Sequence, residues 1–142
     1  HNLSVIKKFR NQLINDKSDF CKGFRNLTYS QLKKTKMPLI RLIGAKCLTI
    51  LTRLNSGHWK LQYPCHGLIG FNYKILNKIN LNQIKKNYFF EQDIIMQVVK
   101  FKGRIKQFKN EVFYNNESSK LNPLMSIIPF LYYHFIYFLK KF

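Results

Sequence analysis

Segments with helical spacing of apolar residues alternate with short apolar runs along this chain of 142 residues. Spacings of three and four predict helices over residues 2–15, 38–56, 73–79 and 89–100. Strand-like runs occur at residues 19–25, 68–71 and 104–114, and residues 63–67 have the composition of a turn. This alternation favours an α/β fold, and the length suits a single domain.

The C-terminal segment is apolar and aromatic. No charged side chain occurs from Leu121 to Leu139, and Lys140 and Lys141 follow. We therefore predict a helix over residues 124–142. Tyrosines beside a lysine pair are typical of the membrane–water interface. A membrane-proximal helix and a helix buried against the domain are both open, and both are favoured over a span, which needs about 20 apolar residues.

The charge of the chain is strongly positive. Lys and Arg number 25 and Asp and Glu number 6, which gives a net charge of +19. The hydrophobic content of 46% excludes a disordered chain. Such a charge favours a phosphate-bearing ligand, a nucleic acid or an anionic membrane surface as partner. Because the basic residues are evenly spread and no recognition motif occurs, we expect no nucleic acid, although a basic nucleic-acid-binding protein remains an alternative.

Three cysteines, Cys21, Cys47 and Cys65, lie far apart and form no Cys-x-x-Cys pair. They predict neither a disulfide framework nor a zinc site, so we expect no metal ligands in this chain. The sequence begins with His1, and its first residues have the pattern of a helix interior. We therefore expect an N-terminal part to be missing.

Glu91 and Asp93 stand out among the six acidic residues because they lie two positions apart in the first turn of a predicted helix. That spacing does not place both carboxylates on one helix face. One could accept a proton while the other caps the helix. Capping by both is the alternative interpretation.

Four motifs in the right order resemble one enzyme family. Phe89–Ile94 resembles a Phe-Phe-Glu-x-Asp block, residues 19–25 an Asp-Tyr-x-x-Gly-x-Arg strand, residues 41–59 a helix ending in Ser-Gly-Tyr-Trp, and residues 114–123 a Tyr-Gly-x-Glu-x-Ser-x-Leu-Asn-Pro segment. These are motifs of bacterial family 2 glycosyltransferases of the polyprenyl-phosphate sugar transferase type, relatives of dolichol-phosphate mannosyltransferase. The resemblance covers about residues 10–142.

The resemblance implies a glycosyltransferase A-type fold, which is a Rossmann-like α/β sandwich around a mostly parallel sheet. Residues 1–123 would form its acceptor side. The family's first half binds the nucleotide-sugar and supplies a metal-binding Asp-x-Asp, and this half is expected to be missing here. A divalent metal, Mg or Mn, is then expected for the complete enzyme, with ligands outside this chain.

The resemblance also implies site residues. Glu91 and Asp93 would deprotonate the acceptor hydroxyl or position the acceptor phosphate, with Asp93 slightly preferred. Arg25 matches an arginine near the active cleft and would bind phosphate through its guanidinium. Ser119 and Lys120 match a late loop that closes over phosphate. The alternatives are a surface salt link for Arg25 and a solvated loop for Ser119 and Lys120.

Two segments depart from the family pattern. Residues 63–67 replace the usual Asp-Pro-Gln-Asn-Gly with Tyr-Pro-Cys-His-Gly, and residues 113–115 replace Arg-Tyr-Gly with Phe-Tyr-Asn. The turn residues Pro64 and Gly67 are kept, whereas the acid and the amides are lost. His66 could substitute as a ligand, but a lone histidine in a turn is more often polar surface.

We therefore expect a glycosyltransferase that moves a sugar from a nucleotide-sugar to a polyprenyl phosphate or a surface glycan. It would act at the cytoplasmic face of the inner (plasma) membrane. This chain is expected to be inactive alone and, because half a sheet leaves an open edge, prone to form oligomers. A non-catalytic, membrane-associated partner subunit is the alternative.

Overall fold

The computed structural model describes residues 3–25, 39–87, 89–110 and 123–139. In chain order the elements are α1 (Leu3–Ile14), β1 (Phe20–Phe24), α3 (Leu39–Ser56), β2 (Ile69–Phe71), α4 (Tyr73–Leu76), the 3-10 helix η1 (Leu81–Gln83), α5 (Phe90–Lys100), β3 (Ile105–Lys109) and α6 (Pro123–Leu139). Helices and strands alternate, so the predicted α/β class is confirmed. The helix predicted at the C-terminus corresponds to α6.

The three strands found in these ranges form one sheet in the order β2-β1-β3. The central strand β1 runs parallel to β3 and antiparallel to β2. Where the resemblance implies a mostly parallel sheet, the described part of the sheet is therefore mixed. β1 supplies buried side chains to both faces of the sheet, because successive residues of a strand point to opposite sides.

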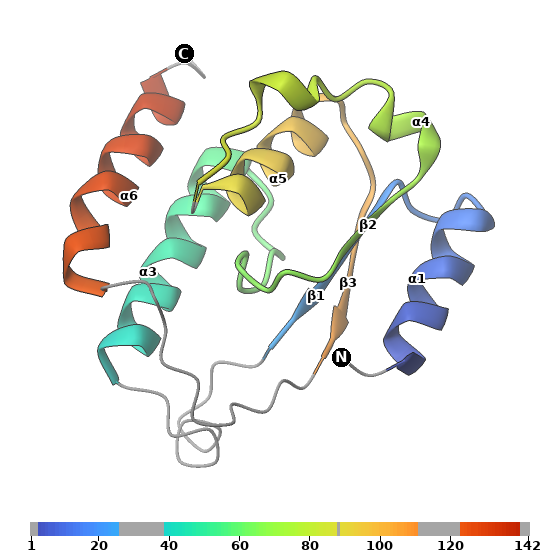
Figure 1. The fold of residues 1–142 in the computed structure, drawn as a ribbon, viewed down its shortest axis with the longest axis horizontal. Coiled ribbons are helices and arrows are strands. Elements are labelled where there is room, and N and C mark those ends of the chain that lie inside the picture. Colours follow the sequence, from blue (N-terminus) through green and yellow to red (C-terminus); the bar gives the residue numbers. More distant parts are fainter. Residues whose placement is uncertain (1–2, 26–38, 88, 111–122, 140–142) are drawn as a thin grey trace.

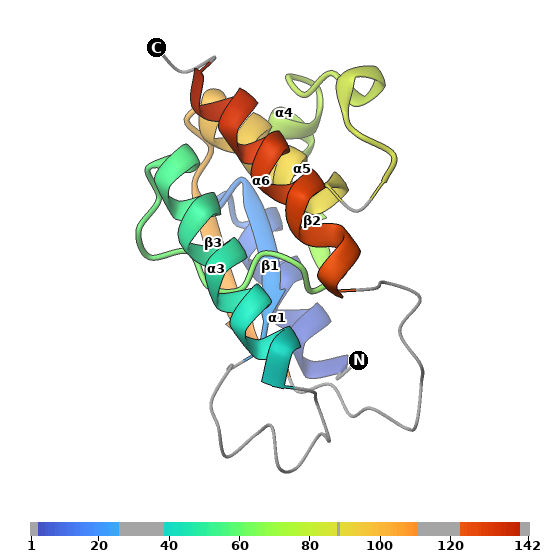
Figure 2. The same cartoon turned by 90° about the vertical axis from the view of Figure 1, so that its left-hand side faces the viewer.

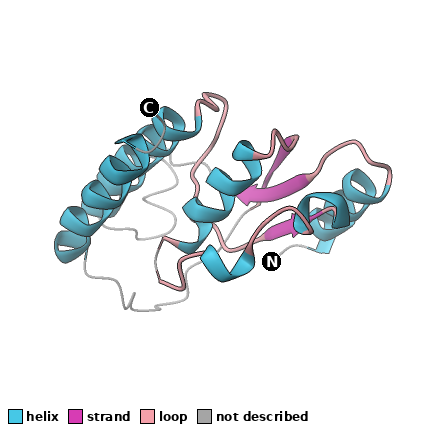
Figure 3. Cartoon of the chain, turned by 90° about the horizontal axis from the view of Figure 1, so that it is seen from above, coloured by secondary structure: helices cyan, strands magenta, loops and turns pink. Residues whose placement is uncertain are grey.

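Helices cover both faces of the sheet (Figure 1). α1 lies on one face and α3, α5 and α6 lie on the other. The view from above shows the strands between these two groups of helices (Figure 3). Phe20 joins the larger core, together with Ile94, Ile95 and Val98 of α5, whereas Cys21 packs with Val5 and Phe9 of α1. The residue after Cys21 is Lys22, which must share the side of Phe20.

α1 approaches the sheet closely at Gly70 of β2. A methyl group at Gly70 would lie 3.1 Å from side-chain atoms of both Phe9 and Leu13. Because Gly70 has no side chain, Phe9 and Leu13 can pack directly on β2.

Helix ends follow local chemistry. α3 ends where the sequence predicts, because Gly57 has a φ of +70° and its N–H donates to the carbonyl of Arg53 at 2.8 Å. α4 is shorter than the predicted helix over residues 73–79. Asn72 caps its start by accepting the N–H of Lys74, and Asn80 accepts the N–H of Asn82 to start η1, which the sequence did not predict. Asparagine side chains that bind nearby backbone N–H groups thus divide this segment into two short helices.

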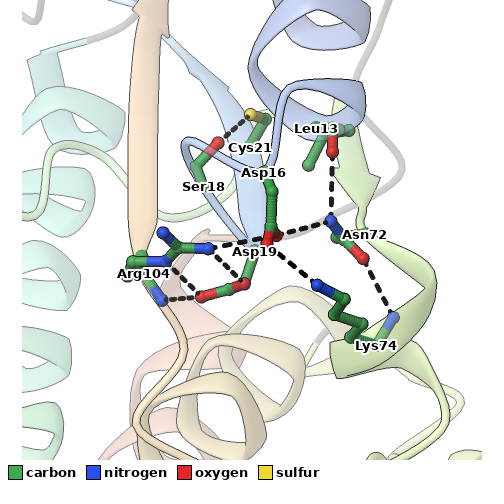
Figure 4. A network of polar contacts seen from close by, with 8 residues as sticks. All are labelled: Leu13, Asp16, Ser18, Asp19, Cys21, Asn72, Lys74 and Arg104. Carbon is green, nitrogen blue, oxygen red and sulfur yellow. Dashed lines mark hydrogen bonds and ion pairs between the residues drawn. The ribbon is translucent and has the colours of Figure 1, made fainter.

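A polar network joins the amino ends of β1 and β3 (Figure 4). The guanidinium of Arg104 pairs with Asp19, with Nε 2.9 Å from Oδ2, and with Asp16 at 3.2 Å. Lys74 Nζ lies 2.8 Å from Asp16 Oδ2, and Asn72 donates to the Leu13 carbonyl at 3.0 Å. Hydrogen bonds from Arg104 hold the pKa of the Asp19 carboxyl below its usual value. Two of the six acidic residues therefore tie the strands together at this end.

α6 packs against α3, and hydrogen bonds from Asn55 join the two helices near the end of α3. Asn55 Nδ2 lies 2.9 Å from both Nδ1 and the carbonyl oxygen of His134, and donates to them. His134 is only 2% exposed, and burial lowers its pKa to about 4. Its Nε2 has no hydrogen-bond partner among the described residues. Within the described ranges, no helix has both the length and the apolar character needed to cross a bilayer.

Replacing His134 with asparagine is expected to reduce the loss of stability in acid. The unfolded histidine titrates near pH 6.5, so between about pH 6.5 and 4 the unfolded chain binds the extra proton, and the free energy of unfolding falls as pH is lowered. His134 contributes about 2 kcal/mol to this fall. The amide oxygen of asparagine can still accept from Asn55 without titrating. Urea unfolding at pH 7 and pH 4.5 measures the difference.

The control for this prediction is His58→Asn, the same substitution at a histidine outside the α3–α6 contact. This variant should lose as much stability in acid as the wild type. If the free energy of unfolding falls equally steeply in acid for His134→Asn and the wild type, His134 is not the source of this fall.

Candidate functional site

The amino end of α5 places Glu91 and Asp93 on different sides of the helix, as their spacing predicts. Phe89 occupies the N-cap position of α5, and its side chain makes no capping hydrogen bond. Both carboxylates instead bind other segments, Asp93 toward α6 and Glu91 toward the loop before β2. The interpretation in which both acids simply cap α5 is therefore not what the structure shows.

Asp93 is buried and joins three segments. Its Oδ1 accepts hydrogen bonds from the hydroxyls of Tyr133 at 2.8 Å and Tyr137 at 2.7 Å, both in α6. Its Oδ2 accepts the backbone N–H of Lys85 at 2.7 Å. The ring of Phe89 stacks on Tyr133 with centroids 4.3 Å apart. Both carboxylate oxygens are thus engaged, and Asp93 connects α5 to α6.

Glu91 faces the loop formed by residues 63–67. Its Oε1 accepts the backbone N–H of Gly67, whose φ of +78° suits glycine. The N–H of His66 and the thiol of Cys65 also interact with this carboxylate. Burial raises the pKa of Glu91 above its usual value, while the Gly67 hydrogen bond and the charge of Lys22 act in the opposite direction. The result is a partly buried carboxylate that holds a proton more readily than an exposed one.

Lys22 supplies a buried cation beside this carboxylate. It is 1% exposed, and its Nζ donates to the carbonyl of Tyr63 at 2.5 Å. Burial lowers its pKa to about 8, and the nearby Glu91 charge opposes that shift. The sequence analysis missed Lys22. The available signal was its position two residues after Phe20 in a strand, which places a lysine on a covered face.

Arg25 and His66 complete the group. The guanidinium carbon of Arg25 lies 5.3 Å from the centroid of the Tyr63 ring, within range of a cation–π contact. His66 is 8% exposed, so its interpretation as polar surface is wrong. Its ring packs on Gly23 of β1, where there is no side chain to exclude it. Burial, with the charges of Arg25 and Lys22, lowers the pKa of His66 to about 4, so the ring is neutral at pH 7.

A second residue of α5 holds the same loop. Gln92 is fully buried, and its Nε2 donates to Cys65 Sγ at 2.7 Å. Together with Glu91 it fixes residues 63–67 against the amino end of α5. We call Lys22, Arg25, Tyr63, Cys65, His66 and Glu91 the Glu91 cluster.

Replacing Gly23 with alanine is expected to displace this loop. The added Cβ would lie 2.3 Å from Cδ2 of His66 and 3.3 Å from Cβ of Leu68, so the imidazole must move. Overpacking of this kind costs about 2 kcal/mol of unfolding free energy. Urea unfolding measures the change.

Gly44→Ala provides the matched control for this prediction. Gly44 lies on an exposed part of α3, and its added Cβ would meet nothing within 4 Å. This variant should gain about 0.5–1 kcal/mol, because alanine is the better helix former. A Gly23→Ala protein as stable as the wild type would show that His66 does not depend on this close approach.

The predicted site residues fall into three sets: those in the Glu91 cluster, Asp93, and those outside the described residues. Glu91 and Arg25 lie in the Glu91 cluster, whereas Asp93 lies on the other side of α5 and binds α6. Ser119 and Lys120 fall outside the described residues. Cys65 and His66 stand where the family carries polar side chains, and they line the same cluster.

The described residues contain no group of three or more histidine, cysteine, aspartate or glutamate side chains that could hold a metal ion.

Comparison with known proteins adds no relative: no family model, no curated protein and no solved structure matches this chain. The likeness to family 2 glycosyltransferases rests on the motifs in the sequence. The structure adds the surroundings of those motif residues that it describes, among them Arg25, Glu91 and Asp93.

Proposed function

We propose that this chain forms the acceptor side of a family 2 glycosyltransferase with a glycosyltransferase A-type fold. The enzyme transfers a sugar from a nucleotide-sugar to a polyprenyl phosphate or a surface glycan at the cytoplasmic face of the plasma membrane. One observation carries this proposal. The glutamate of the Phe-Phe-Glu-x-Asp block is partly buried, has a raised pKa, and lies beside Lys22 at the carboxyl half of β1.

The reaction requires an acceptor oxygen to attack the anomeric carbon of the donor sugar. The bond from that carbon to the diphosphate oxygen breaks, and the nucleoside diphosphate leaves with the electron pair. With a hydroxyl acceptor, Glu91 takes the proton as the new bond forms, a task for which a carboxylate with a raised pKa is suited. With a phosphate acceptor no proton is removed, and the cationic side chains of Lys22 and Arg25 attract and orient the oxyanion.

The proposal assigns the base to Glu91 and a positioning role to Asp93. Asp93 is 3% exposed and is covered by Tyr133, Tyr137 and the backbone of Lys85, so a substrate does not reach its carboxylate. Glu91 is also bonded to protein groups, but it is more exposed than Asp93, and its surroundings include the cations that an anionic acceptor needs. The chemistry of the motif therefore favours its first acid.

The test offers the gene product that contains this chain a panel of nucleotide-sugars, with a short polyprenyl phosphate and a hydroxyl-bearing glycan as acceptors. Transfer of labelled sugar to either acceptor supports the proposal. Absence of transfer from every donor, by a folded protein, rejects it in favour of the non-catalytic subunit.

A further inference from the structure

Two helices present apolar side chains to solvent on the same side of the molecule. α3 and α6 lie side by side there, facing the viewer in Figure 2, with the sheet behind them. In α6 the exposed apolar residues are Ile127, Ile128, Leu131, Tyr132, Phe135, Phe138 and Leu139. In α3 they are Leu39, Ile40, Ile43, Ile50 and Leu54. We call this surface the α3–α6 apolar face.

The exposed residues of α6 follow a helical stripe opposite the docked side. Tyr133 and His134 are buried toward α5 and α3, whereas Ile128 is 77% and Tyr132 is 66% exposed. At about 100° per residue, Ile128, Tyr132 and Phe135 fall close together on the outer side of the helix, and all three are exposed. α6 is therefore apolar on its outer side as well as at its contact with the protein.

α3 repeats this arrangement. Leu42, Ala45 and Leu48 are buried, while Leu39, Ile43, Ile50 and Leu54 recur on the opposite side at spacings of four and seven. Extended exposed apolar surfaces of this kind mark interaction sites in soluble domains. Two adjacent helices that share one apolar side make a broader surface than either helix alone.

The charges around this face identify the partner. Neither α3 nor α6 contains an acidic residue, and the exposed Lys46 lies beside the apolar stripe of α3. Lys140 and Lys141 follow α6 in the sequence. A second copy of the chain also carries a net charge of +19 and would be repelled. A bilayer with negative headgroups attracts the basic residues, and its acyl chains can take up the exposed apolar side chains.

We propose that the α3–α6 apolar face lies on an anionic phospholipid surface, with both helices in the plane of the membrane. Its apolar side chains enter the headgroup and acyl boundary, and the basic residues contact the headgroups. Asp93 keeps α6 in the orientation that this contact needs through Tyr133 and Tyr137. This inference deepens the proposed function, because it names the surface from which a lipid-linked acceptor would be presented.

The test measures co-flotation of the chain with vesicles of phosphatidylcholine alone and of equal parts phosphatidylcholine and phosphatidylglycerol. The variant Ile50→Asp/Leu131→Asp changes one exposed residue on each helix of the face. Its matched control, Leu3→Asp/Ile14→Asp, makes the same charge change at exposed apolar residues of α1, on the other face of the sheet. Both variants should unfold at the wild-type temperature, because the replaced side chains are exposed.

We expect the wild type and the control to float with the anionic vesicles and to dissociate as salt is raised. The Ile50→Asp/Leu131→Asp variant should bind about 100-fold more weakly, because two large apolar side chains no longer enter the lipid. Equal binding by this variant and the control, or equal binding of the wild type to both vesicle types, overturns the proposal. A wild-type dimer that fails to float and is dissociated by the Ile50→Asp/Leu131→Asp changes assigns the face to a second copy.

Vesicle binding requires neither donor sugar nor acceptor, so the outcome is independent of transfer activity. If the chain floats as expected while the gene product transfers no sugar, the membrane contact stands and the proposed enzyme function fails. If sugar is transferred but the chain does not float, the proposed enzyme function stands and the membrane contact fails.

Discussion

Replacing Glu91 with glutamine is expected to lower kcat for transfer to a hydroxyl acceptor by about 10²–10⁴-fold, the usual contribution of a general base. Glutamine keeps the size of the side chain and can still accept the N–H of Gly67, but it cannot take a proton. KM for the acceptor should change little, because the cluster's cations remain. With a phosphate acceptor the fall in kcat should be much smaller, so the ratio of the two effects identifies the class of acceptor.

The pH profile provides a second readout for Glu91. In the wild type, kcat should fall in acid as the Glu91 carboxylate is protonated, at a pH above that of an ordinary glutamate because burial raises its pKa. This acid limb should disappear in Glu91→Gln. Asp16→Asn is the control, since it removes an exposed carboxylate from the network at the other end of the sheet. Unchanged kcat of Glu91→Gln with a hydroxyl acceptor would falsify the role of Glu91 as base.

Replacing Asp93 with alanine is expected to lower the free energy of unfolding by about 4 kcal/mol. The substitution leaves three donors without their acceptor: the hydroxyls of Tyr133 and Tyr137 and the backbone N–H of Lys85. Buried donors without a partner cost more than the lost bonds are worth, because they have also left water. Urea unfolding followed by circular dichroism measures the loss.

Two tyrosine variants calibrate the Asp93 prediction. Tyr133→Phe removes one of the three hydrogen bonds and should cost about 1–2 kcal/mol, less than Asp93→Ala. Tyr132→Phe makes the same change at the neighbouring tyrosine, which is 66% exposed, and should be close to neutral. In a double-mutant cycle, Asp93→Ala and Tyr133→Phe should not be additive. A loss below about 1 kcal/mol in Asp93→Ala would contradict the connecting role of this carboxylate.

Apolar spacing predicts most helices and strands of this fold, but it does not always mark the buried side of a helix. Val5 and Phe9 of α1 have helical spacing and are both buried, whereas Leu39, Ile43 and Ile50 of α3 have helical spacing and are exposed. The prediction is wrong where side chains compete with the backbone. Asn72 caps α4, which ends at Leu76 although the sequence predicts a helix over residues 73–79, and Asn80 starts η1, which the sequence does not predict. Apolar periodicity indicates that a helix forms, but it reports neither which side of the helix is covered nor such local hydrogen bonds.

The sequence predicts the two acids of the candidate site but not all of the residues around them. The spacing of Glu91 and Asp93 correctly predicts that they point apart, but it does not tell which one faces the protein interior. That depends on Tyr133 and Tyr137, about 40 residues away in the chain. Lys22 was missed and the burial of His66 was not predicted, because both depend on the loop of residues 63–67 packing on β1, a contact between distant segments.

The network at the amino end of β1 also affects how charge is distributed along the sheet. Asp16 and Asp19 neutralise Lys74 and Arg104 there, so no cation of this network is left without a counter-charge. Toward its carboxyl end, the same strand leads from Lys22 to Arg25, with Glu91 as the nearby acid. The Asp16–Asp19 network thus pairs two cations with two acids, whereas the Glu91 cluster has two cations, Lys22 and Arg25, and one acid, so of these two groups the Glu91 cluster is the more favourable for an anion. Encounter with a phosphate-bearing molecule should accordingly be fast at low ionic strength and slow down as salt is added.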